Sequence, residues 1–139
     1  MTQIASIPGN GTQFLLRLLQ ENDIKVTDVG HLTDSLDLSG WGDIICPVRP
    51  PRAVAYSWAK REHNYGWDAM YERLKTIPAH FFFIDDRGKA LDRLEDYLGK
   101  ELTTDWALVN HCEARPLDAV VNEQQIRNAE DIYHEIKMR

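Results

Sequence analysis

The sequence predicts a three-layer α/β/α domain in which helices cover both faces of a mostly parallel sheet. Three observations lead to this prediction: apolar runs of strand length alternate with segments of helical periodicity, a glycine-rich turn follows the first strand, and no internal repeat divides the chain. Strands that alternate with helices are joined by crossovers and therefore run parallel. The chain has 139 residues, 43% of them hydrophobic, which suits one core, so we expect residues 1–139 to form a single domain.

The first third of the chain predicts strand, turn, helix and two further strands. Residues 3–7 form a short apolar run that ends at the turn Pro8–Thr12, and the segment FLLRLLQEN that follows from residue 14 has apolar residues at helical spacing. Residues 24–29 alternate as a strand with one exposed face does. The continuous apolar run at 43–48 is typical of a strand buried on both faces.

The remaining chain continues the alternation. Pro50 and Pro51 stand at the entrance of a helix, where a missing N–H costs little. Gly99 follows an amphipathic segment and is expected to cap its C-terminus. The elements predicted here are a helix at 52–62, a helix at 67–76, a strand at 80–84, a helix at 89–98 and a helix at 124–137.

Composition excludes several classes of function. The net charge of −6 argues against binding of a nucleic-acid polymer, which requires a basic face. No apolar stretch approaches the roughly 20 residues that span a bilayer, and the N-terminus has no basic region followed by an apolar one, so we expect no membrane partner and a cytoplasmic location. Cys46 and Cys112 lie far apart without metal-ligand spacing, so each is interpreted as a buried free thiol and no metal site is expected.

The basic residues are unevenly distributed. From Ile44 to Arg61 the chain has no acidic residue. An acidic protein with one local basic segment suits a compact anion better than a polymer. The basic residues of this window are Arg49, Arg52, Lys60 and Arg61.

The turn Pro8–Thr12 is the first candidate anion site. It lies between a strand and a helix, so its backbone N–H groups and the helix N-terminus converge on one point, which suits phosphate or sulfate. No lysine follows Gly11, which disfavours an ordinary ATP or GTP phosphotransferase. The alternative is that the turn only connects a strand to a helix.

The second candidate site runs from Arg49 to Ser57. Arg49 follows the apolar strand at its carboxyl end, and Ser57 lies eight residues later inside the predicted helix. A guanidinium fork and a hydroxyl placed in this way can hold one phosphate from two sides. The alternative is a solvated arginine and a serine on the helix surface.

These two segments together resemble the PAPS-dependent sulfotransferases. The pattern Arg-x-Pro-Arg-x-Val-Ala-x-Ser at 49–57 looks like the 3′-phosphate motif of that family, and PGNGTQFL at 8–15 is similar to its 5′-phosphosulfate loop. The order of the two motifs is also that of the family. Weaker matches are VGHL at 29–32, YGW at 65–67, FFIDD at 82–86 and LEDYLG at 94–99, so the resemblance covers roughly residues 4–102.

The resemblance implies a P-loop NTPase-like sulfotransferase fold, with PAPS as sulfuryl donor and PAP as product. His31 would be the general base that takes the proton of a hydroxyl or amine acceptor. A histidine after a strand is otherwise a structural residue, and Tyr-Gly-Trp is otherwise a turn with core aromatics. The residues that the resemblance assigns to the nucleotide are Pro8, Gly9, Asn10, Gly11, Thr12 and Gln13 at the 5′-phosphosulfate, Arg49 and Ser57 at the 3′-phosphate, and Tyr65 or Trp67 at the adenine.

The chain departs from the family pattern in its first loop. Gly9 stands where the family has a lysine or arginine that stabilises charge during transfer, and such a donor is worth about two to three powers of ten in rate. Arg17, Lys60 or another cation from elsewhere in the protein would have to take its place. No convincing copy of the family's C-terminal basic loop is present, and Arg115 is a weak substitute.

The chain is shorter than most members of that family and lacks the insertions that enclose the acceptor in them. The resemblance therefore implies an acceptor site that is open, completed by a second subunit, or formed by a partner protein. Three functions remain as alternatives. The first function is sulfuryl transfer. The second is a nucleotide-binding or regulatory module of the same fold without transfer, and the third is a nucleotide or small-molecule kinase.

Overall fold

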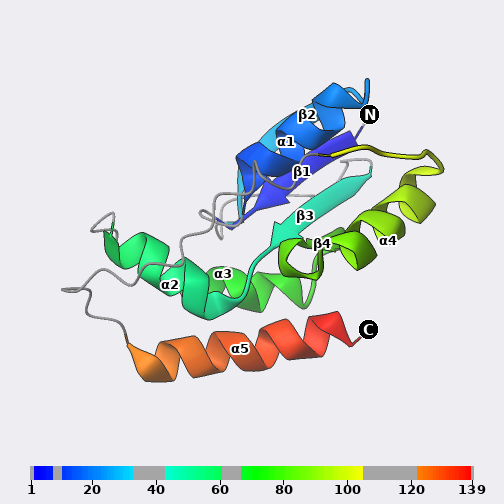
Figure 1. The fold of residues 1–139 in the computed structure, drawn as a ribbon. Helices are drawn as coiled ribbons and strands as arrows, with labels where there is room; N and C mark the ends of the chain where they lie inside the picture. Colours follow the sequence, from blue (N-terminus) through cyan, green and yellow to red (C-terminus); the bar gives the residue numbers. More distant parts are fainter. Residues whose placement is uncertain (1, 8–10, 33–42, 61–66, 105–121, 139) are drawn as a thin grey trace.

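The computed structural model describes residues 2–7, 11–32, 43–60, 67–104 and 122–138, and in this part the chain forms a parallel sheet flanked by helices (Figure 1). The sheet has four strands in the order β2-β1-β3-β4, and every neighbouring pair is parallel. The α/β class and the parallel sheet that the sequence predicts are confirmed. The strands are β1 (Thr2–Ser6), β2 (Val26–His31), β3 (Ile44–Val48) and β4 (His80–Phe83).

The predicted helices are all present, with ends that differ by a few residues. A short 3-10 helix follows β4 directly, and it begins at Ile84, which the sequence analysis had assigned to the end of the strand. The helices are α1 (Thr12–Glu21), α2 (Pro51–Lys60), α3 (Trp67–Leu74), the 3-10 helix η1 (Ile84–Asp86), α4 (Gly88–Leu98) and α5 (Glu123–Lys137).

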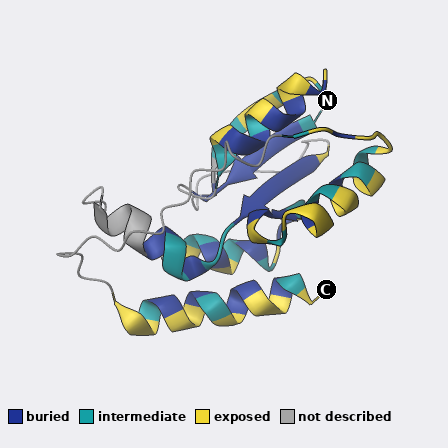
Figure 2. Cartoon of the chain, in the orientation of Figure 1, coloured by how far each residue is buried: buried dark blue, intermediate teal, exposed yellow. Residues whose placement is uncertain are grey.

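Helices cover both faces of the sheet because successive residues of a strand point to opposite sides. Ile45 packs in a cluster with residues of α1 and α4, whereas its neighbours Ile44 and Cys46 pack in a second cluster with residues of α2, α3 and α5. All five residues of β3 are buried, which confirms the prediction of a strand enclosed on both faces. In Figure 2, β3 and all of β1 except its first residue are buried, while the outer faces of the helices are exposed.

The strand predicted at 24–29 instead begins at Val26 and extends to His31. The turn that closes α1 accounts for the shift. The N–H of Ile24 donates to the carbonyl of Leu19 at 3.0 Å, and Asp23 has a φ of 59°. Residues up to Ile24 therefore finish the helix and are not free to start the strand.

Two local predictions from the sequence are confirmed. Gly99 caps α4 in the left-handed region, at φ 68°, and its N–H donates to the carbonyl of Glu95. Cys46 is a free and fully buried cysteine, and burial raises the pKa of its thiol well above the usual value. Cys112 lies outside the described residues. None of the helices described is long and apolar enough to cross a membrane.

His80 makes the stability of the fold depend on pH. Burial, together with the positive charge of Arg93, lowers the pKa of His80 below its ordinary value of 6.5. The unfolded chain therefore takes up a proton that the native chain resists, so stability falls as the pH drops from 6.5 through the lowered pKa. We expect His80→Gln to lose less stability than the wild type between about pH 7.5 and about pH 5.5, as measured by urea unfolding at each pH. An equal loss in both proteins would contradict this expectation.

Candidate functional site

The strand order places a topological switch point between β1 and β3. The chain leaves β1 through α1 to reach β2 on one side, and β3 lies on the other side of β1. The helices that follow β1 and β3 also pack on opposite faces of the sheet, α1 in one core cluster and α2 in the other. In open parallel sheets, ligands bind in the crevice outside the carboxyl ends of the strands at such a point.

The two loops that the sequence analysis assigned to an anion leave the sheet at this position. The loop before Gly11 follows β1, and Arg49 follows β3 directly. The pairing of β1 with β3 ends at Ile4 and Ile45, although β3 continues to pair with β4 as far as Val48. Pro47, which has no N–H to donate, lies beyond the last β1–β3 pair. β1 and β3 are therefore no longer paired with each other at the carboxyl ends where the two loops begin.

Gly11 fixes how the first loop enters α1. Its φ of 81° is in the left-handed region, and a Cβ at this position would lie 2.2 Å from Cδ1 of Ile84. Its carbonyl accepts the first helical hydrogen bond, from the N–H of Leu15 at 3.1 Å. Gly11 therefore lets the backbone turn tightly above η1, and no other residue type fits without a shift.

The N-terminus of α1 carries no compensating negative charge. Gly11 is the N-cap and offers no side-chain hydrogen bond, and the first turn of α1 contains no acidic residue. The positive end of the helix dipole, which lies at the carboxyl edge of β1, is therefore not neutralised by a carboxylate of the first turn. This arrangement suits an anion.

Ser6 links the first loop to both neighbouring elements, and the sequence analysis missed it. The hydroxyl of Thr12 donates to Oγ of Ser6 at 2.7 Å, and the carbonyl of Ser6 accepts from the N–H of Leu32 at 2.8 Å. Ser6 is fully buried and pairs in register with His31. Its only signal in the sequence is a polar residue at the last position of an apolar strand, where a buried hydroxyl needs a partner.

The Ser6–Thr12 bond holds the Thr12 hydroxyl in place at the mouth of the loop. Hydroxyl protons rotate, so Ser6 can also be the donor, and the proton of Thr12 is then available to an anion. Either way, the Thr12 side chain has a buried anchor. His31 ends β2 beside this pair, which places its backbone at the same edge of the sheet.

The backbone of Arg49 is hydrogen-bonded to a buried tyrosine. The hydroxyl of Tyr71, a fully buried residue of α3, donates to the carbonyl of Arg49 at 2.7 Å. This bond fixes the backbone at the carboxyl end of β3. Arg49 itself is half-buried, so the loop holds its backbone while part of the residue stays accessible.

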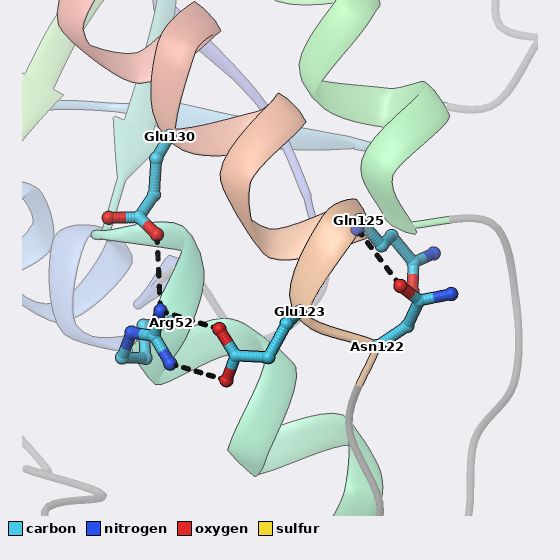
Figure 3. Close-up of polar contacts among 5 residues, drawn as sticks. All are labelled: Arg52, Asn122, Glu123, Gln125 and Glu130. Atoms are coloured by element: carbon cyan, nitrogen blue, oxygen red, sulfur yellow. Dashed lines mark hydrogen bonds and ion pairs between the residues drawn. The ribbon is translucent and has the colours of Figure 1, made fainter.

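Arg52 is not available to a ligand in this structure (Figure 3). Its guanidinium forms a two-pronged ion pair with Glu123, at 2.9 and 3.0 Å, and lies 3.4 Å from Glu130. Asn122 caps the same end of α5 by accepting from the N–H of Gln125 at 3.1 Å. The basic segment that the sequence analysis described is therefore partly neutralised by α5.

Arg17, which the sequence analysis considered as a cation for the first loop, lies near a carboxylate of its own helix. Nε of Arg17 lies 3.8 Å from the carboxylate of Glu21, one turn further along α1. Gln13 lies on the exposed side of α1 and lines a shallow hollow there together with Arg17 and Gln20. Gln13 therefore lies on the solvent side of α1, whereas the backbone at Gly11 packs against Ile84 of η1.

The structure thus brings some predicted site residues together and leaves others untested. Gly11, Thr12 and the backbone of His31 lie at one edge of the sheet, with Arg49 at the same edge after β3. Among the described residues, no group of three His, Cys, Asp or Glu side chains is arranged to hold a metal. Outside the described residues lie Pro8, Gly9, Asn10, Arg61, Tyr65 and Arg115 entirely, and the side chains of His31, Ser57, Lys60 and Trp67.

Comparisons of the chain with protein-family models, with curated proteins and with solved structures found no match. The chemistry of the site therefore has to be inferred from the residues and from their positions in the sheet.

Proposed function

We propose that this chain binds PAPS and PAP at the switch point between β1 and β3 and transfers a sulfuryl group to a hydroxyl or amine acceptor. One observation carries the proposal: the two segments that resemble the phosphate-binding motifs of sulfotransferases follow adjacent parallel strands at the edge where such sheets bind ligands. Both segments follow neighbouring strands at one edge of the sheet, and this placement supports the proposal that they bind one nucleotide with two phosphate groups.

The described residues fit an anionic nucleotide. The N-terminus of α1, with no acid in its first turn, and the anchored hydroxyl of Thr12 would hold the 5′-phosphosulfate. Arg49, on a backbone fixed by Tyr71, would form a forked pair with the 3′-phosphate, with Ser57 as a second donor. PAPS supplies the activated sulfuryl group.

His31 would act on the acceptor, not on the nucleotide. In the proposed role its imidazole takes the proton from the acceptor hydroxyl as the acceptor oxygen bonds to sulfur and the bond from sulfur to the PAP oxygen breaks. The position of His31 at the end of β2, beside Ser6 and the first loop, is compatible with this role.

A second candidate function is nucleotide binding without transfer. Gly9 removes the usual loop cation, Arg17 is engaged by Glu21, and Arg52 is engaged by two carboxylates of α5. Without a cation to stabilise charge on the leaving oxygen, transfer slows by about two to three powers of ten. The same fold would then serve as a binding or regulatory module.

Calorimetry with three nucleotides tests the proposed ligand. We expect PAP to bind, AMP to bind at least about tenfold more weakly because it lacks the 3′-phosphate, and ATP to stabilise the protein against heat less than PAP. No binding of PAP, or greater stabilisation by ATP, would overturn the proposal, and the second result would favour a kinase.

Incubation with radiolabelled PAPS and a panel of phenols, alcohols and amines separates sulfuryl transfer from binding without transfer. Labelled product supports transfer, and its absence supports the binding module.

A further inference from the structure

A cavity lies beside β4, at the end of the sheet away from the switch point between β1 and β3. It has a volume of about 660 Å³ and is bounded by β4, by α4 and by the C-terminal part of α5. In Figure 1, β4 lies between α4 and α5 at the end of the sheet opposite β2. Its volume is in the range of cavities that bind small molecules, roughly 300–1,000 Å³.

Aromatic rings form much of the wall. Phe81 and Phe83 project from alternate positions of β4, with ring centroids 6.2 Å apart. His80 stacks on Tyr97 of α4 at 4.6 Å with an angle of 20° between the rings. Burial and a hydrogen bond from its hydroxyl to Asp43 raise the pKa of Tyr97, so this ring is tied at its outer end. Flat aromatic surfaces of this kind suit a ligand that itself carries a ring.

The charged residues of the lining are all basic. Arg93 comes from α4 and Lys137 from α5, and none of the residues that line the cavity is acidic, although the protein as a whole has a net charge of −6. Lys137 is 2.9 Å from Asp86 and 3.3 Å from the hydroxyl of Tyr133. Arg93 is therefore the side chain that we assign to an anionic group, with Lys137 as a second, partly neutralised positive charge.

His80 supplies a polar atom that has no partner. Its Nε2 is buried and makes no hydrogen bond in the part of the chain that the structure describes. A buried polar atom without a partner costs free energy, so such atoms are rare and often mark the place of a ligand or a water. The lining thus combines apolar rings with a guanidinium, and it includes a histidine whose buried Nε2 has no partner among the described residues.

We propose that this cavity binds a small aromatic carboxylate, with its ring against the His80–Tyr97 pair and its carboxylate toward Arg93. A carboxylate accepts hydrogen bonds through two oxygens, so it can form a forked pair with the guanidinium of Arg93. The site is separate from the carboxyl edge of β1 and β3 and does not depend on the nucleotide proposed there.

Nuclear magnetic resonance of the histidine side chains tests the proposal, with benzoate as the probe and benzamide as its uncharged counterpart. The His80 signal is identified by its loss in His80→Gln. We expect benzoate to shift this signal in a saturable manner and benzamide to bind at least about tenfold more weakly. No saturable shift at benzoate concentrations up to tens of millimolar, or equal affinity for benzamide, would overturn the proposal.

Two matched variants separate recognition by the cavity from general attraction of anions. Arg93→Gln should weaken benzoate binding by about tenfold, because it removes the guanidinium and keeps a side chain of similar length. Arg127→Gln removes an exposed charge on α5 that does not line the cavity and should leave the affinity unchanged. Equal weakening by both variants would show that only net charge matters and would refute the assigned site. Circular dichroism confirms that each variant is folded.

Discussion

Replacing Gly11 by alanine is expected to destabilise the native protein by about 2–4 kcal/mol, the sum of a backbone and a packing cost. The φ of 81° puts any L-residue in the left-handed region, which costs roughly 1–2 kcal/mol. The new methyl group would also lie 2.2 Å from Cδ1 of Ile84, a residue that is 2% exposed and held within the core cluster of α1 and α4. Urea unfolding of the variant and of the wild type measures the difference.

Two further substitutions divide this expected loss into its parts. Gly99 also has a positive φ, 68°, but no atom lies within 4 Å of the position of its Cβ, so Gly99→Ala should cost only the backbone part, about 1 kcal/mol. Ile84→Val removes Cδ1, and Gly11→Ala should therefore cost less in that background than in the wild type. If Gly11→Ala lowers the free energy of unfolding no more than Gly99→Ala does, the contact with Ile84 does not contribute to the loss, and the expected packing cost is wrong.

Replacing Arg49 by alanine is expected to lower the affinity for PAP by about tenfold to a hundredfold. The reason is the loss of a forked, charge-assisted contact to the 3′-phosphate, and such hydrogen bonds contribute roughly 1.5–3 kcal/mol. Arg49→Lys should recover only part of the affinity, because an ammonium group keeps the charge but not the fork. Calorimetry with PAP gives both values, and AMP, which lacks the 3′-phosphate, should bind the wild type and the alanine variant about equally.

Arg52 provides the matched control for this experiment. It lies three residues after Arg49 in the same basic segment, but its guanidinium is occupied by Glu123 and Glu130. Arg52→Gln should therefore change PAP affinity little, with a stability effect of at most about 1 kcal/mol, as is usual for exposed ion pairs. If Arg52→Gln weakened PAP binding more than Arg49→Ala, the assignment of the two arginines would have to be exchanged. Thermal unfolding of each variant separates loss of binding from loss of fold.

Much of the fold could be predicted from the sequence because the signals are local. The apolar run at 43–48 becomes a strand with all five of its residues buried, and Gly99 ends a helix in the left-handed region. The glycine turn was placed correctly between β1 and α1. Each of these features depends on hydrogen bonds and side-chain periods that extend over only a few residues.

The candidate site could be predicted only in part, because some of its partners are distant in the chain. Arg52 was interpreted as part of a local basic segment, yet its carboxylate partners are 71 and 78 residues away on α5. Ser6 has a role only because Thr12 and the backbone of Leu32 fold against it. The cavity beside β4 likewise combines residues of three elements that no sequence pattern connects.

The sequence by itself determined which segments form strands and helices, where the chain needs a glycine, and which two loops have the composition of anion sites. Only the tertiary structure decided that β1 and β3 are neighbours, that the loops of Gly11 and Arg49 leave the same edge, and that α5 neutralises Arg52. The physical reason is that periodicity records which side of an element is buried, whereas strand order and ion pairing depend on the burial of all elements together. The resemblance at Arg49–Ser57 therefore suggested a phosphate site, and the strand order shows which edge of the sheet this segment follows.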